Sequence, residues 1–420
     1  MEEIEDACIN GNLELFKSLI NKEVVHEVDE GGLSLFHHAA SSENESLDCL
    51  KCMEILLNYG ADIELRDLEG NTPLHFACDN GRVEKVKFFL EHGGSFDAVD
   101  NYGDTPLHFA CDRGHIEILK CLIMNNLNIE AVNSFGNTPL HFACHEGHIE
   151  IVKYLIVNNA SIEATDNYGN TSLHFACDRG HTQIVKYLIV NNANIESVNN
   201  DGNTPLHFEC DRGHTQIVKY LIINNANIEA VDNFGNAPLH LACDKGHTET
   251  VKCLLEYNKA NIEAVNNQGS TPLIIACLDG NASIVNLLLE HHANINVISD
   301  VGSYTCLHAA CANGNIEVIT TLFDYEINEL ITDITDNQNR TALELAEHRG
   351  HYQVVSNWKT IKSKVFIQYH IKYLLLLCII TLLFIIVFFT FPLILMYRVV
   401  FEEQLEKIFL IIFFFTIVVY

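Results

Sequence analysis

A short motif returns along this chain at a nearly constant spacing, and this periodicity constrains the fold more than any other feature. Thr-Pro-Leu-His, or a close variant, recurs every 33 residues from Thr72 to Ala237 and then at slightly longer steps as far as Thr341. A shorter copy, "SLFHHAA", begins at Ser34. Internal periods of about 20–50 residues indicate solenoids or other arrays of one repeated supersecondary unit.

One unit of the period, residues 166–198, contains a turn and two helical patterns. "DNYGN" is polar with a glycine and predicts a turn. Thr171 is placed to cap a short apolar helix over 173–177, and most other copies have proline at the next position, where a helix tolerates it. Gly180 is expected to end that helix with a positive φ. "HTQIVKYLIV", residues 181–190, then predicts a second, amphipathic helix.

Each unit offers one apolar face that two short helices cannot bury alone. Stacked copies bury it against their neighbours, so the pattern predicts an all-α solenoid. Asn192 falls where a left-handed residue is expected, because asparagine tolerates that conformation. We expect one buried phenylalanine per unit, each stabilising the array by roughly 1.5–3 kcal/mol. These residues are Phe76, Phe109, Phe142, Phe175 and Phe208.

The unit "DNYGNTSLHFACDRGHTQIVKYLIVNNANIES" resembles the ankyrin repeat nearly position by position, and the resemblance covers residues 1 to about 355. It implies L-shaped turn–helix–helix units, a concave partner-binding surface and no catalytic residues. We predict an N-terminal capping half-repeat over 1–27, followed by a solenoid of about ten units over 28–355.

The resemblance also implies which side chains meet a protein partner, because the family's variable positions lie at the turn tips and on the first helices. Aromatic side chains beside arginine suit the energetic centre of an interface. An ordinary solvated face with unremarkable tips is an equally supported alternative. The tip residues are Tyr102, Phe135, Tyr168 and Phe234. The first-helix residues are Asp112, Arg113, Asp178, Arg179, Asp211, Arg212, Asp244 and Lys245.

The overall charge argues against a nucleic-acid partner. With 25 basic and 55 acidic residues the chain has a formal net charge of −30, which repels phosphate backbones. The N-terminal "MEEIEDACIN" is acidic and does not resemble a secretory signal. Its 15 cysteines, mostly at the repeat period, predict buried thiols in a reducing compartment, not a disulfide framework. We therefore expect the solenoid to lie in the cytosol.

The repeated His-x-x-Cys-x-x-x-His pattern raises the question of a metal site. Zinc needs four converging ligands, but Gly180 separates Cys177 from His181 and sends the second histidine along another path. Other units lack one member without compensation; Arg82 and Ile274 stand at histidine positions. We therefore interpret the first histidine of each unit as a structural hydrogen-bonding group and the cysteine as a core residue, with no metal or cofactor.

Other candidate sites are weak. Cys49 and Cys52 form a lone CxxC without a second pair of ligands. The Asp/Asn-rich turns have their glycine in the wrong place for an EF-hand. The sequence contains no Gly-rich phosphate loop and no evident small-molecule site. Glu209 replaces the small alanine of the first helix, and a carboxylate there is costly unless it is paired or neutralised.

The chain changes character after Trp358. We predict a basic juxtamembrane linker over 356–372, a transmembrane helix over the uncharged residues 373–397, and a short polar loop with a terminal apolar segment over 398–420. The apolar residues 408–420 are open between a short second span, a re-entrant segment and a segment that lies on the bilayer. The lysines before the apolar run place the repeats on the cytosolic side of a membrane.

Taken as a whole, the sequence predicts a membrane-tethered protein-binding scaffold or adaptor without catalysis. The alternative is a regulatory or truncated subunit of an S-acyltransferase or a cation channel, since both classes carry cytosolic ankyrin repeats. The former needs an Asp-His-His-Cys motif and the latter about six spans, and this sequence contains neither. A soluble metal buffer is a third and weaker hypothesis.

Overall fold

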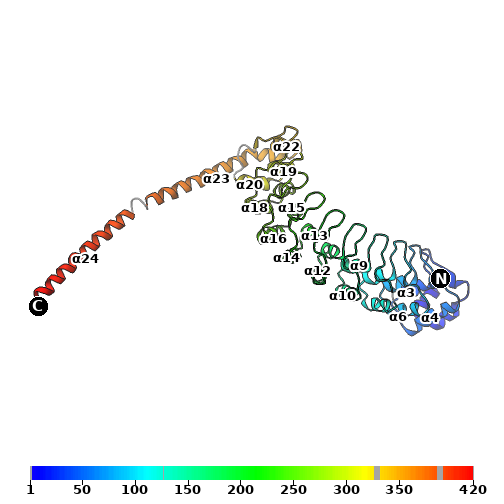
Figure 1. The fold of residues 1–420 in the computed structure, drawn as a ribbon. Helices are drawn as coiled ribbons and strands as arrows, with labels where there is room; N and C mark the ends of the chain where they lie inside the picture. Colours follow the sequence, from blue (N-terminus) through cyan, green and yellow to red (C-terminus); the bar gives the residue numbers. More distant parts are fainter. Residues whose placement is uncertain (1, 126, 326–331, 386–390, 420) are drawn as a thin grey trace.

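The computed structural model describes residues 2–125, 127–325, 332–385 and 391–419, and these form a curved all-α solenoid with a helical extension at its C-terminal end (Figure 1). The helices occur in consecutive pairs, and each pair packs on the next. The first helices are α1 (Glu2–Ile9), α3 (Leu35–Ser41), α5 (Pro73–Asp79), α7 (Pro106–Asp112), α9 (Pro139–Glu146), α11 (Ser172–Asp178), α13 (Pro205–Arg212), α15 (Pro238–Asp244), α17 (Pro272–Asp279), α19 (Cys306–Asn313) and α22 (Ala342–His348).

The second helices form the other layer, and hairpin-like turns connect each pair to the next (Figure 1). They are α2 (Leu13–Leu19), α4 (Leu47–Asn58), α6 (Val83–Glu91), α8 (Ile116–Ile123), α10 (Ile149–Val157), α12 (Thr182–Val190), α14 (Thr215–Ile223), α16 (Thr248–Asn258), α18 (Ala282–Glu290), α20 (Ile316–Asp324) and α23 (Tyr352–Ile385). A short 3-10 helix, η1 (Val24–His26), follows α2, and α24 (Phe391–Val419) ends the described chain.

In most units the landmark histidine joins its unit to the next, as His174 illustrates. Its Nδ1 accepts the backbone N–H of the helix N-cap, Thr171, at 3.1 Å, and its Nε2 donates to the carbonyl of Asn203 at 3.0 Å. Burial lowers the pKa of this ring to about 4, so the imidazole is neutral. The predicted structural role of the first histidine is therefore confirmed. The equivalent histidines are His37, His75, His108, His141, His207, His240 and His308.

The core runs between the two layers and is built from small residues and thiols of the first helices and aliphatic residues of the second. Cys177 is fully buried, and burial raises the pKa of its thiol well above the ordinary value. The expected burial of the phenylalanines is wrong in degree, because they are only partly buried. Each lies between neighbouring first helices with its ring against the histidine of the preceding unit, as Phe175 does against His141 at 5.2 Å between ring centroids. The set is Phe76, Phe109, Phe142, Phe175 and Phe208.

Two predicted backbone positions are confirmed. Gly180 has a φ of +72° at the end of α11, and Asn192 has a φ of +68° after α12. An alanine at Gly180 would also place its Cβ 2.7 Å from the ring of His214. Glycine at this position therefore serves both the turn and the close approach of the next unit.

Glu209 is the one departure from the small-residue pattern of the first helices that lies in the middle of the array. Its side chain on α13 is fully buried. One carboxylate oxygen, Oε2, lies 3.0 Å from Nδ1 of His214, whereas Oε1 has no hydrogen-bond partner. Burial raises the pKa of Glu209 to about 7, and the hydrogen bond to Glu209 raises the pKa of His214. The carboxylate is therefore only half accommodated.

The N-terminal residues differ from the expected half-repeat. Residues 1–27 contain both α1 and α2, which pack on each other and on the first full unit. Ile4 and Phe16 are buried there. The cap is therefore a pair of helices. The first helix was not predicted, because its acidic first turn does not match the apolar first helix of the other units.

The C-terminal region also differs from the prediction. Residues 356–372, expected as a linker, belong to α23, and Trp358 packs there against Phe323 at 5.6 Å between ring centroids. Residues 398–407, expected as a polar loop, are helical within α24, where Arg398 lies 3.6 Å from Glu402. Such pairs at i, i+4 favour a continuous helix.

The predicted transmembrane helix over 373–397 does not correspond to one helix of the structure. Its residues are divided between the end of α23 and the start of α24, and residues 386–390 lie outside those described. Across 2–125, 127–325, 332–385 and 391–419, we find no helix that is both long and apolar enough to cross a membrane. Polar residues explain this in part, because α24 carries Glu402, Glu403 and Glu406 near its middle.

Candidate protein-binding surface

The tip of each hairpin turn is shaped by its own polar residues, as the turn at Tyr102 shows. The side chain of Asp100 accepts the backbone N–H of Tyr102 at 2.9 Å and that of Asp104 at 2.8 Å. Gly103 follows with a φ of +83°. These bonds fix the turn, because Asp100 holds the backbone amides of both Tyr102 and Asp104, and the side chain of Tyr102 is exposed at its tip.

Neighbouring tips are also bonded to one another. The backbone N–H of Asn167 donates to the carbonyl of Phe135 at 2.9 Å, and its side-chain amide donates to the carbonyl of Ser134 at 3.0 Å. The turns consequently form a continuous edge along one side of the solenoid (Figure 1). The same side-chain amide bond is made by Asn101, Asn200, Asn233 and Asn267.

The predicted tip aromatics are exposed on this edge, with exposed fractions of 55% for Tyr102, 47% for Phe135, 62% for Tyr168 and 67% for Phe234. Tyr102, Phe135 and Tyr168 lie in consecutive units. The next unit has Asp201 at its tip, and the unit after it has Phe234. A row of aromatics on a pre-organised edge loses little conformational entropy on binding, which favours a binding surface.

Sequence reasoning missed a second row beside these tips. Three residues before the aromatic position, valine is exposed in several units, for example Val132 before Phe135 and Val231 before Phe234. The signal was present in the sequence as "AVNSF" and "AVDNF", in which the valine recurs at the repeat period. Together, the two rows widen the apolar part of the hairpin edge.

The predicted charged residues at the ends of the first helices pair across units. Nε of Arg113 lies 2.7 Å from Asp79, and Arg212 lies 2.7 Å from Asp178. Lys245 follows the same pattern with Asp211 at a longer distance of 3.8 Å. The hydrogen bond to Asp79 raises the pKa of Arg113. These groups are partly exposed, so each pair contributes only about 0–1 kcal/mol to stability and can exchange its partner on binding.

The remaining charged candidates follow the same row. Arg179 donates from Nε to Nε2 of His145 at 2.9 Å, since histidine replaces aspartate in that unit. Burial raises the pKa of Asp112, which also lies 3.5 Å from Arg113. Asp244 pairs with Lys245 at 2.8 Å. The eight charged candidates thus recur at the repeat period, and Arg113, Arg179, Arg212 and Lys245 link neighbouring units, whereas the ion pairs of Asp112 and Asp244 lie within their own units.

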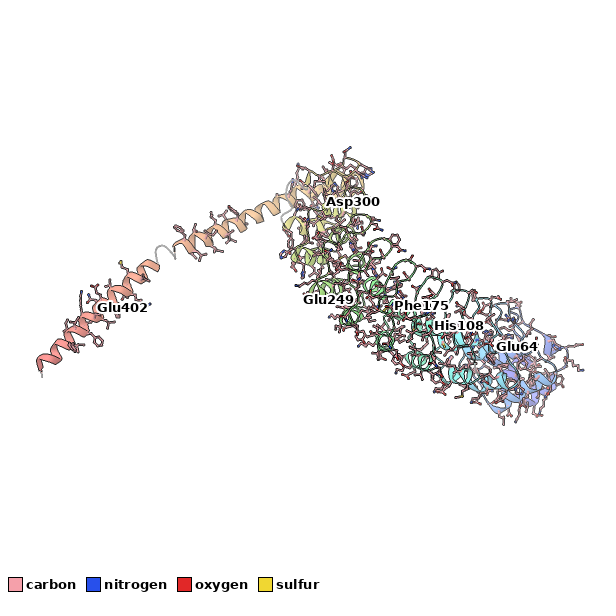
Figure 2. The ribbon with its side chains drawn as sticks, in the orientation of Figure 1. Glu64, His108, Phe175, Glu249, Asp300 and Glu402 are labelled. Carbon is pink, nitrogen blue, oxygen red and sulfur yellow. The ribbon has the colours of Figure 1, made fainter. Side chains whose placement is uncertain are left out.

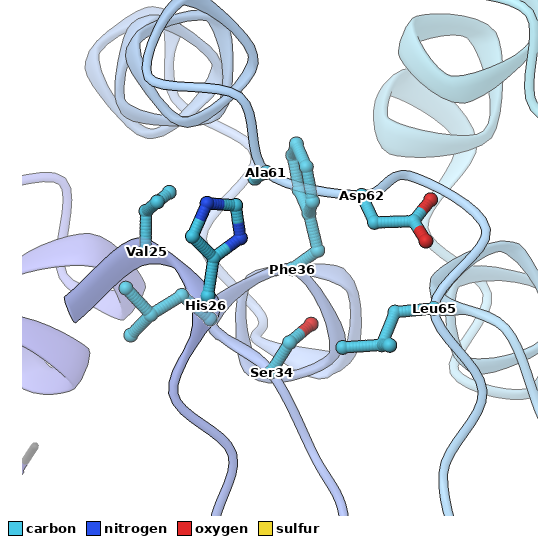
Figure 3. Close-up of a pocket in the computed structure, with 8 residues that line it drawn as sticks. Val25, His26, Ser34, Phe36, Ala61, Asp62 and Leu65 are labelled. Atoms are coloured by element: carbon cyan, nitrogen blue, oxygen red, sulfur yellow. The ribbon is translucent and has the colours of Figure 1, made fainter. Parts of the chain in front are cut away.

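A small cavity lies near the N-terminal end of the solenoid (Figure 3). Its volume is about 220 Å³, and Val25, Phe36 and Leu65 supply much of its apolar lining, with His26 and Asp62 as polar groups. Figure 3 shows these side chains arriving from η1, the start of α3 and the turn after α4. Small-molecule sites are commonly about 300–1,000 Å³, so this cavity is a packing gap between units.

The His/Cys pattern is accounted for by bonding and burial. His181 donates from Nε2 to the carbonyl of His145 at 2.9 Å, and Cys177 is buried in the core. Cys49 and Cys52 are buried in α4. In the parts of the chain that the structure describes, no group of three or more His, Cys, Asp or Glu side chains is placed to hold a metal ion.

The paired helices and linked hairpins define a class, the ankyrin solenoids. A family model for ankyrin repeats (3 copies) matches overlapping stretches from residue 4 to residue 357, so the chain belongs to the ankyrin-repeat family. The matched stretches are 4–100, 48–133, 93–166, 157–232, 210–299 and 296–357.

Among characterised proteins, the chain is similar to protein phosphatase 1 regulatory subunit 27 of Homo sapiens and of Mus musculus. Each is 38% identical over 63 residues. The match covers 15% of this chain and 38% of each relative, so it spans well under half of their length.

Proposed function

We propose that this chain is a protein-binding scaffold whose partner lies against the hairpin edge and the adjoining ends of the first helices. The observation that carries the proposal is the row of exposed aromatics on hydrogen-bonded tips, at Tyr102, Phe135 and Tyr168 in consecutive units. The row of paired charges beside them supplies polar contacts at the rim. Aromatic and arginine side chains dominate the energetics of protein interfaces.

Replacing the tip aromatics is expected to abolish partner binding while leaving the solenoid folded. Each hot-spot aromatic contributes about 2 kcal/mol or more, so the combined change of Tyr102, Phe135, Tyr168 and Phe234 to serine should weaken binding by well over tenfold. Crosslinking and mass spectrometry in native extracts, followed by titration with the identified partner, measure the effect. The exposed Leu47 changed to serine is the control. Equal binding by the tip variant and the control would remove the hairpin edge as the binding surface.

Protein phosphatase 1 is the first partner to test, because the two similar proteins are named as its regulatory subunits. Titration of the full chain with the purified phosphatase catalytic subunit, with and without the tip changes, gives the answer. Binding that the tip changes remove would identify the phosphatase as a partner. Absence of binding would exclude it and leave the search to crosslinking.

We further propose that the C-terminal region holds the scaffold at the cytosolic side of a membrane. Residues 373–397 contain no charge, and the described side chains of Leu374, Leu377 and Leu383 are more than half exposed. Exposed apolar surface on this scale marks an interaction with a membrane or another apolar surface. The lysines that precede the run support the cytosolic orientation of the repeats.

Charge placed in this run should release the chain from membranes. Lysine at Leu376, Ile380 and Leu383 is expected to convert a membrane-bound chain into one that alkaline washing extracts, because a charge in the hydrocarbon core costs about 3 kcal/mol. Fractionation of expressing cells measures the distribution. The same three changes to alanine serve as the control and should remain bound. Alkaline release of the unaltered chain would refute the tether.

A further inference from the structure

A row of exposed apolar side chains ends the second helices of four consecutive units, far from the hairpin tips. The exposed fractions are 77% for Met124, 73% for Val157, 73% for Val190 and 77% for Ile223. These residues occupy the same repeat position at steps of 33, directly after α8 or at the last position of α10, α12 and α14. Because each of these helices packs beside the next, the four side chains share one face. We call this row the outer strip.

The outer strip has defined ends. The same repeat position is Glu91 in α6 and Glu256 in α16, so a carboxylate bounds the row on each side. The position therefore accepts a charged residue without loss of the helix. The repeat therefore does not require an apolar residue at this position. The four apolar residues between Glu91 and Glu256 point to a role other than folding.

A row of lysines accompanies the outer strip. Lysine stands four residues before each apolar position, one helical turn away on the same face. Acidic partners accompany the first two, with Lys120 bonded to Glu117 at 2.7 Å and Lys153 to Glu150 at 2.8 Å. Lys186 instead lies over the ring of Tyr220 at 5.4 Å, which ties α12 to α14. The lysines beside the strip are Lys120, Lys153, Lys186 and Lys219, and the row continues as Lys87 and Lys252 beside the bounding glutamates.

The charge of this face is unusual for the chain. Helices α12 and α14 contain no aspartate or glutamate, since Gln183 and Gln216 replace the glutamate of the neighbouring units. This occurs in a chain with a net charge of −30. The centre of the outer strip is thus a local basic and apolar surface that favours an acidic, partly apolar partner.

The outer strip is separate from the hairpin edge. The second helices line the edge of the solenoid opposite to the turns (Figure 1). Figure 2 shows this separation at two labelled residues, with Glu249 on α16 at one edge and Asp300 in a hairpin turn at the other. A partner on the outer strip would leave the hairpin edge accessible, so this inference stands whether or not the proposed function is correct.

The spacing of the strip selects the shape of its occupant. Packed helices lie about 8–10 Å apart, and this separates successive apolar side chains of the strip. Seven residues of an α-helix rise about 10.5 Å, so a helix with one apolar residue per heptad matches the strip along its whole length. Acidic residues along one flank of such a helix would face the lysine row.

We propose that the outer strip binds an amphipathic helix of a partner protein, with an apolar residue in each heptad and acidic residues on one flank. A bilayer fits the surface less well. Glu91 and Glu256 lie at both ends, Glu117 and Glu150 lie beside the strip, and the net negative charge repels anionic lipid. The strip also lacks the tryptophan and phenylalanine that interfacial membrane contacts favour.

The test uses the full chain and a synthetic helical peptide of about four heptads with leucine in each heptad and glutamate on one flank. The change of Val190 and Ile223 to glutamate is expected to weaken peptide binding at least tenfold. Changing Lys186 and Lys219 to glutamate should do the same, and Glu256→Val, which extends the strip, should strengthen binding. Fluorescence titration measures the dissociation constants, and circular dichroism checks the folding of every variant. We expect the Val190 and Ile223 variant to stay folded, because Glu91 and Glu256 occupy the equivalent positions in other units.

Three outcomes would overturn the proposal. The first is equal affinity of the glutamate variants and the unaltered chain for the acidic peptide. The second is tighter binding of a matched peptide with lysine in place of glutamate. The third is evidence for a different occupant. If the Val190 and Ile223 variant no longer floats with phosphatidylserine vesicles, the occupant is a membrane. If it no longer forms a dimer in sedimentation, the occupant is a second copy of this chain.

Discussion

Replacement of Glu209 by alanine is expected to raise the free energy of unfolding of the central repeats by about 2–4 kcal/mol at pH 8. The carboxylate is fully buried, Oε1 has no hydrogen-bond partner, and Oε2 lies 3.0 Å from Nδ1 of His214. Alanine occupies the equivalent place in neighbouring units, for example at Ala176, so the smaller side chain fits the site. Denaturant unfolding and hydrogen exchange of α13 measure the gain.

The gain should grow with pH. Because the pKa of Glu209 is raised to about 7, the folded chain holds a proton that the unfolded chain releases near pH 4.5. The stability from this proton is therefore present below about pH 4.5 and is lost as the pH rises through about 7. The raised pKa of His214 acts in the same direction. The difference between alanine and glutamate should thus be small at pH 5 and larger by about 3 kcal/mol at pH 8.

Two further variants separate charge from shape. Glu209→Gln keeps the size of the side chain and should remove the pH dependence but only part of the destabilisation. Ala176→Glu places a carboxylate in the matching unit and should reproduce the destabilisation there. We also expect His214 in the alanine variant to bond the carbonyl of Asp178, as His181 bonds that of His145. A variant no more stable than the original chain at pH 8 would contradict this account.

Replacement of His174 by alanine is expected to cost about 3–5 kcal/mol. The buried ring bonds Thr171 within its unit and Asn203 of the next, and its edge packs on Phe208 at 5.5 Å between ring centroids. Its loss leaves a buried donor and a buried carbonyl unsatisfied. Chemical denaturation measures the cost, and the next unit should lose hydrogen-exchange protection as well.

The control comes from the chain itself, which carries isoleucine at the same place in α17, where Ile274 is buried. His174→Ile should therefore cost less than His174→Ala, because it restores packing though not hydrogen bonds. A His174→Ile variant as stable as the original chain would show that packing, not hydrogen bonding, explains the position.

Acid should destabilise the array, because the buried histidines that join the units must then take up protons. Burial lowers the pKa of His75, His108 and His174 to about 4, whereas an unfolded histidine titrates near 6.5. The unfolded chain binds more protons in that window, so the stability due to neutral histidine is present above about pH 6.5 and is lost as the pH falls towards 4. This trend is opposite in sign to that of Glu209, and His174→Ala should reduce it.

The sequence predicted those features that depend on the equivalent residues of the next repeat or on the local backbone conformation. Gly180, Asn192 and the bonding of His174 are of this kind, because every copy repeats the same local demand. Contacts that depend on the path of the chain were not predictable. Glu209 meets His214 only because the turn at Gly213 returns the chain towards α13.

In the proposed binding surface, the exposure of the tip residues was predictable but their bonding to neighbouring units was not. The exposed aromatics at the tips were identified from the pattern, whereas the pairing of Arg212 with Asp178 depends on how far each unit rotates on the next. The C-terminal region was the least predictable part. Hydropathy defined an apolar run over 373–397, but the helix that includes its first half begins at Tyr352 and uses Trp358 to attach to the solenoid.

The asparagine bonds between hairpin tips have a mechanical consequence. Each side-chain amide, such as that of Asn200 or Asn233, reaches only the carbonyl of the unit before it. Tension applied along the solenoid is therefore carried by links in series, and the weakest link yields first. Leu68, Ser134 and Asp300 lack the amide at this position, so a stretched chain should lengthen first at those three joints, one repeat at a time.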